Sequence, residues 1–164
     1  MESWSRVIVR EVRQAARVVV VGIGNVARGD DAAGARVAGD MLAGKKPASA
    51  KALVIAAGQV PENYTGVVRA FGPDLVVLVD SAGAGRRPGS VFFVDRAAIA
   101  DDDVSTHRLP LARIARYLEE TMACRVLVLG IEPSSFDGTG MSPAVGRAVR
   151  KVVAVLEKAL AADG

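Results

Sequence analysis

Four residues that follow a predicted strand or precede a predicted helix have side chains that could hold a divalent metal ion or move a proton. Asp30 and Asp31 follow a run of valines and a glycine-rich turn. Asp80 ends a second apolar run, and His107 is the only histidine. Asp31, Asp80 and His107 would together make a three-ligand site for a divalent metal, with positions left open for water or substrate. A metal that a substrate can reach polarises a carbonyl group and makes a bound water more acidic.

The same side chains also have purely structural interpretations. Asp31 could stabilise the N-terminus of a helix, where the helix dipole favours negative charge. Asp80 could cap the polar loop that follows its strand, and His107 could hydrogen-bond to backbone at the start of a helix. Spacing along the chain leaves both interpretations open.

The elements that must position these residues alternate between strand and helix. Strands are predicted over residues 17–22, 51–57, 75–79, 90–94 and 125–131, and helices over 31–43, 61–71, 111–118 and 143–161. This alternation predicts an α/β fold, a three-layer α/β/α sandwich with a twisted, mostly parallel five-stranded sheet. The short connection before residues 90–94 makes that strand the antiparallel one. Since parallel strands end at a common edge, Asp31 and Asp80 converge if the first and third strands are neighbours.

The first strand and its turn aim Asp31 at this edge. Residues 18–21 (VVVV) are β-branched and continuous, as expected for a strand buried on both faces of a parallel sheet. Gly22 and Gly24 allow the backbone to turn tightly. In the helix that follows, Gly34 and Gly39 should let the helix pack close to the sheet.

Composition limits the class of protein. The 164 residues fit one domain spanning the whole chain, with residues 1–16 as a peripheral N-terminal extension. Lys and Arg are scattered and the net charge is only +3, so no nucleic-acid footprint is expected. The single Cys124 excludes an intrachain disulfide and fits a reducing cytoplasm. No apolar run is long enough to span a bilayer, and no secretory signal is found, so a cytoplasmic protein without membrane insertion is expected.

Two other chemistries are less well supported by the residues. Residues 22–27 (GIGNVA) fit the permissive dinucleotide-binding fingerprint after a strand. However, Asp30 and Asp31 would repel a pyrophosphate, and the strand ending at residues 56–58 (AAG) offers no acid for a ribose. Covalent catalysis is not indicated either, because no serine lies in a nucleophile-elbow setting. The run Asp101–Asp103 is interpreted as a solvated acidic stretch.

Several motifs, taken in order, resemble one family. The segments GIGN with RGDDAAG, then VDSAGAG, STHRLPL and LGIEPSSFDGTGMSP resemble those of the hydrogenase maturation endopeptidases. The segment GQVPENYTG is most similar to the branch that processes formate-hydrogenlyase-type hydrogenases. The resemblance implies the sandwich fold described above. It also implies a protease that removes the C-terminal extension from the large-subunit precursor of a [NiFe] hydrogenase after nickel insertion.

The resemblance also implies roles for individual residues. Asp31, Asp80 and His107 would be the catalytic residues and metal ligands, and they would engage nickel that the precursor supplies. Asp30, Gly24 and Asn25 would support these ligands or contact the substrate. One carboxylate could take a proton from a nickel-bound water.

This chain departs from the family pattern at two positions. Ala56 stands where the family commonly has an acid, and Ala32 stands where it has a glycine. A non-catalytic module that recognises the nickel-loaded precursor is the alternative function.

Overall fold

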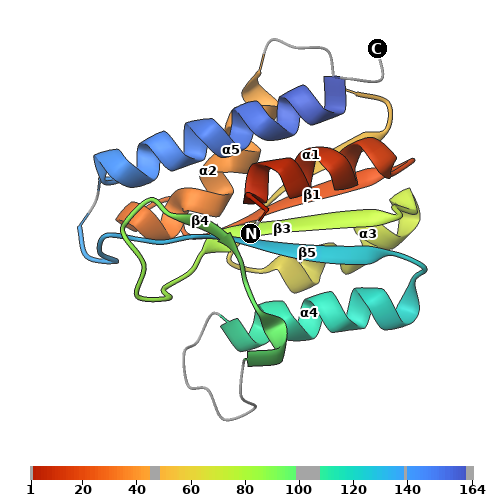
Figure 1. Ribbon diagram of the computed structural model, residues 1–164. Coiled ribbons are helices and arrows are strands. Elements are labelled where there is room, and N and C mark those ends of the chain that lie inside the picture. The colour runs from red at the N-terminus through yellow and green to blue at the C-terminus, as the bar shows by residue number, and fades with distance from the viewer. Residues whose placement is uncertain (1, 45–48, 99–107, 139, 162–164) are drawn as a thin grey trace.

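The computed structural model describes residues 2–44, 49–98, 108–138 and 140–161. Its centre is a five-stranded sheet in the order β2-β1-β3-β5-β4 (Figure 1). The strands are β1 (Val18–Ile23), β2 (Ala52–Gly58), β3 (Leu75–Ser81), β4 (Val91–Phe93) and β5 (Arg125–Ile131). Four strands run parallel, and β4 pairs antiparallel with β5 at the edge of the sheet. The predicted fold class is confirmed, and β1 and β3 are neighbours.

Helices cover both faces of the sheet and complete the three layers (Figure 1). They are α1 (Trp4–Gln14), α2 (Ala33–Ala43), α3 (Thr65–Phe71), α4 (Arg108–Thr121) and α5 (Pro143–Ala161). Helices α1, α2 and α5 pack on one face, whereas α3 and α4 pack on the other. No helix in the described part of the chain combines the length and the apolar character that crossing a membrane would need.

The valine run of β1 belongs to both halves of the core because successive side chains of a strand point to opposite faces. Val18 and Val20 pack with α1, α2 and α5, while Val19 and Val21 pack with α3 and α4. All four are at most 3% exposed. Burying a valine completely contributes about 1.5–3 kcal/mol, so this strand is a central source of stability.

The prediction that residues 1–16 form a peripheral extension was wrong. Residues 4–14 form α1, and Ile8 and Val12, one turn apart, are completely buried in the core. The apolar face of α1 is narrow, and charged residues interrupt it in the sequence. Packing against α5, and not the sequence pattern of α1 alone, therefore makes this helix part of the core.

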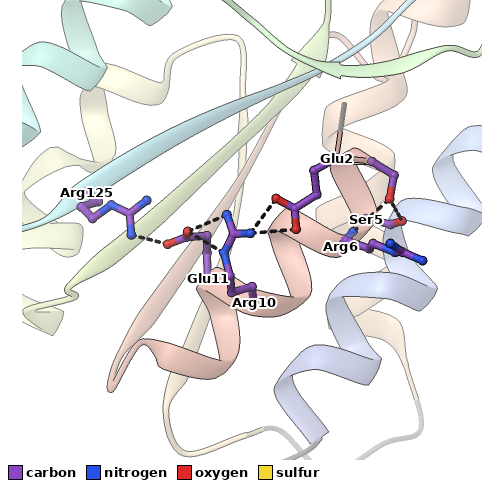
Figure 2. A network of polar contacts seen from close by, with 7 residues as sticks. Glu2, Ser5, Arg6, Arg10, Glu11 and Arg125 are labelled. Carbon is purple, nitrogen blue, oxygen red and sulfur yellow. Dashed lines mark hydrogen bonds and ion pairs between the residues drawn. The ribbon is translucent and has the colours of Figure 1, made fainter.

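Helix α1 is also tied to the amino-terminal edge of the sheet by charged groups (Figure 2). Arg125, the first residue of β5, donates a hydrogen bond to Glu11, which is 7% exposed. Arg10 donates to Glu11 and pairs with Glu2. The hydrogen bond from Arg125 lowers the pKa of Glu11 despite its burial. Lys51 adds a further tie, because its ammonium donates to the backbone oxygens at the end of α1.

Candidate active site

Asp31 and Asp80 lie together at the carboxyl edge of the sheet, where β1 and β3 end side by side. Asp80 is the penultimate residue of β3, and Asp31 lies in the short 3₁₀ turn Gly29–Ala32 after β1. Both are buried, at 4% and 5% exposure. Ser81 connects them, because its backbone N–H donates to Asp80 Oδ1 (2.8 Å) and its hydroxyl donates to Asp31 Oδ1 (3.3 Å).

Two glycines allow Asp31 to reach this position. Gly24 has a φ of +147°, and a Cβ there would stand 2.1 Å from the carbonyl oxygen of Asp31. A Cβ on Gly34 would stand 2.0 Å from the carbonyl oxygen of Val79 in β3. Close backbone packing of α2 on the sheet thus needs glycine at residue 34, as predicted. The same prediction for Gly39 was wrong, because a Cβ built there meets no atom of the sheet or of another segment within 4 Å.

The electrostatic surroundings of Asp80 favour its neutral form. Burial raises the pKa of Asp80 well above its ordinary value, and the negative charge of Asp31 acts in the same direction. The single hydrogen bond from Ser81 opposes this and does not outweigh it. A pair of buried carboxylates that repel each other suits a divalent cation, whose charge would relieve the repulsion. Two carboxylates are present at this edge, and the described residues contain no group of three or more His, Cys, Asp or Glu side chains that could hold a metal ion.

Asp30 has the opposite surroundings, although it is the direct neighbour of Asp31. Its carboxylate accepts hydrogen bonds from Ser142 N (2.7 Å), Ser134 N (2.9 Å), Ser142 Oγ (3.0 Å) and Ser135 N (3.4 Å). Burial raises the pKa of Asp30, but these hydrogen bonds outweigh it and the pKa is lowered. Asp30 therefore holds the loop after β5 against the loop after β1.

Of the two other residues predicted for the site, one is described by the structure and the other lies outside the described residues. Asn25 accepts a hydrogen bond from the backbone N–H of Ala27 (3.0 Å) and so shapes the turn after β1. His107 lies outside the described residues, directly before the first residue of α4 in the sequence. The run Asp101–Asp103 also lies outside them. Of the three expected metal ligands, the structure therefore describes the two carboxylates.

Sequence reasoning missed two polar residues of this edge, Ser81 and Glu132. Glu132 is 6% exposed, and its Oε2 accepts a hydrogen bond from the backbone N–H of Ala84 (2.7 Å). Its backbone also bonds to Gly89 and Ser90, so it holds the loop 82–90 at both ends. Glu132 comes directly after β5, and Ser81 follows Asp80 as the last residue of β3. Their positions at the carboxyl ends of buried strands were the available signal for them.

Comparison with known proteins assigns the family. A family model described as hydrogenase maturation protease matches residues 38–159. The chain belongs to this family. A protein of Methanocaldococcus jannaschii that carries the name of a hydrogenase maturation protease is 30% identical over an alignment of 151 positions, and the match covers 89% of each chain.

Solved structures of maturation proteases have the same architecture. The crystal structure of the [NiFe] hydrogenase maturation protease HycI from Thermococcus kodakarensis superimposes with a TM-score of 0.84 and 32% identity. That match covers 94% of this chain and 98% of the other. The solution structure of the endopeptidase HycI from Escherichia coli gives a TM-score of 0.75 at 30% identity, over 87% of this chain and 90% of the other. The hydrogenase maturation protease family therefore replaces the dinucleotide-binding interpretation, and its activity is the processing of hydrogenase precursors.

Proposed function

We propose that this maturation protease removes the C-terminal extension of a [NiFe] hydrogenase large-subunit precursor, and that it acts after nickel has been inserted. The nickel is part of the substrate in this proposal. The observation that carries it is the pair of buried, mutually repelling carboxylates, Asp31 and Asp80, at the edge of the sheet. Such a pair is poorly stabilised by the protein itself and gains from an approaching cation.

Each residue of the pair has a separate role in the proposal. Asp31 receives a hydrogen bond from Ser81 and so keeps its orientation toward Asp80. Asp80, whose pKa is raised by burial, is suited to take a proton from the attacking water and return it to the leaving amine. His107 is proposed as the third group that engages the nickel, on the resemblance of the STHRLPL segment. The nickel, when the substrate brings it, supplies polarisation of the scissile carbonyl.

The test is incubation of the purified protein with a nickel-containing large-subunit precursor, followed by mass spectrometry of the products. We expect two products, the shortened large subunit and the released C-terminal peptide. The same precursor without nickel should remain intact, which tests the order of insertion and cleavage. A His107→Ala variant should lose cleavage, and undiminished cleavage would remove His107 from the mechanism. Binding of the precursor without any change in its mass would instead favour the non-catalytic recognition module.

A further inference from the structure

A pocket whose lining contains neither Asp31 nor Asp80 lies beside β4, the edge strand of the sheet. It is a pocket of about 370 Å³ between the first turn of α1, the start of β4 and one face of α5. Its lining includes Trp4, Gly89, Val91, Ala144, Arg147 and Lys151. The volume is within the range of pockets that bind small molecules or a few residues of a peptide.

The chemistry of this pocket favours an anion. Arg147 and Lys151, which lie one turn apart on α5, are exposed side chains, and the lining contains no carboxylate. Within the described part of the chain, neither is paired with an acidic residue. Lys151 Nζ lies 5.7 Å from the centre of the Trp4 ring, so this ammonium group lies beside an aromatic side chain. Carboxylates bind well to such cations, because hydrogen bonds between charged groups are stronger than neutral ones.

The walls of the pocket are fixed to the active site. Gly89 is packed on α5 so closely that a Cβ would stand 2.6 Å from the backbone oxygen of Ala144. Its loop, residues 82–90, directly follows Ser81, which hydrogen-bonds to both carboxylates, and is held by Glu132. The other wall, α5, begins directly after Ser142, which is bound to Asp30. The pocket therefore has a fixed position relative to the carboxylate pair, and one bound polypeptide could contact both.

We propose that this pocket is a second contact site for the protein substrate, where Arg147 and Lys151 bind an acidic segment remote from the bond that is cut. The proposal rests on the proposed function, because it takes the occupant to be part of the precursor. The predicted effect of the site is on substrate binding and not on the chemical step.

Trp4 makes the pocket directly observable, because it is the only tryptophan of the chain. We would titrate the wild-type protein with acetylated hexaglutamate at about 0.15 M ionic strength, which screens diffuse attraction, and follow Trp4 fluorescence. We expect a saturable change in emission. Acetylated hexalysine and inorganic phosphate at the same concentrations should not produce it.

The variant for this test is Arg147→Ala/Lys151→Ala. Its Kd for hexaglutamate should rise about tenfold, as expected when two charge-assisted contacts are lost. The matched control, Arg150→Ala/Lys158→Ala, removes the same two residue types from exposed positions on the same helix outside the pocket. It should bind as the wild type does. With the precursor, the pocket variant should raise KM about tenfold and leave kcat unchanged.

Three results would overturn the proposal: no saturable change of Trp4 emission, an equal change with phosphate alone, or equal weakening by the pocket and control variants. Unchanged circular dichroism and Tm of each variant would show that it is folded. The fluorescence titration does not depend on cleavage. If the protein does not cleave the precursor, hexaglutamate should still change Trp4 emission. If the pocket does not bind hexaglutamate, the wild type should still cleave the precursor.

Discussion

The buried acids at the two edges of the sheet have opposite surroundings. At the amino edge, Glu11 lies between Arg10 and Arg125, and the hydrogen bond from Arg125 lowers its pKa (Figure 2). At the carboxyl edge, Asp80 faces the negative charge of Asp31, and burial raises its pKa. Both acids are less than 8% exposed, so burial alone does not distinguish them. The difference lies in the partners that the fold supplies.

This contrast separates acids that stabilise the fold from acids available for chemistry. A buried carboxylate is unfavourable unless charges or hydrogen bonds compensate it. Glu11 and Asp30 are compensated, and each joins two segments distant in the sequence. Asp80 is not compensated to that degree, and groups with raised pKa values of this kind are concentrated at functional sites. The variants described next should separate these two classes.

The largest effect is expected for Asp80→Asn. The amide cannot accept the proton of the attacking water, so cleavage of the precursor should fall by about 1,000-fold. Stability should not fall, because the amide oxygen can still accept the hydrogen bond from Ser81 and the repulsion by Asp31 is removed. Cleavage rates and thermal unfolding of both proteins test this. Activity within about tenfold of wild type would show that Asp80 is not the proton acceptor.

The next effect is expected for Asp30→Ala, and it is one of stability. The substitution leaves the backbone N–H groups of Ser134, Ser135 and Ser142 without their acceptor. The free energy of unfolding should fall by about 3 kcal/mol, the range found when buried polar groups lose their partners. Urea denaturation measures this change. The control Asp137→Ala removes an exposed acid from the same loop and should change the stability by no more than about 0.5 kcal/mol.

The smallest effect is expected for Glu11→Gln at the amino edge. At neutral pH the loss of stability should be about 1 kcal/mol, because the exposed Arg125 is partly screened by solvent. The lowered pKa of Glu11 means that its contribution is present above the pKa of the unfolded carboxyl group and is lost as the pH falls through the folded value. The difference between wild type and variant should therefore shrink in acid. Urea denaturation across the acidic range checks it, and cleavage should not change.

For Asp80→Asn, urea denaturation of the metal-free protein should show the opposite pH dependence of stability relative to wild type. A raised pKa makes the wild type lose stability as the pH rises above the unfolded value, since the buried charge must then form. As the pH rises toward neutral, the free energy of unfolding of Asp80→Asn should therefore increase relative to wild type. That of Glu11→Gln should decrease relative to wild type. Parallel slopes for the two variants would contradict the distinction between the two edges.

Much of this arrangement is predictable from the chain alone. The valine run, the glycine turn and the alternation of strands with helices predict the parallel sheet. The rule that parallel strands end at one edge then places Asp31 beside Asp80. These features depend on local backbone preferences and on the burial of apolar side chains, which the order of residues expresses directly. The family motifs agree with this prediction because they occur in order along the same elements.

Other features depend on contacts between segments far apart in the chain. Asp30 and Asp31 are identical neighbours, but they lie in a 3₁₀ turn, where successive side chains point about 120° apart. Only the packed loops decide that one binds the serines after β5 and the other faces Asp80. The burial of α1 and the joining of Trp4 with Arg147 and Lys151 in one pocket are decided in the same way. Residue order predicts where a strand ends, whereas the partner that each side chain meets there is set by tertiary packing.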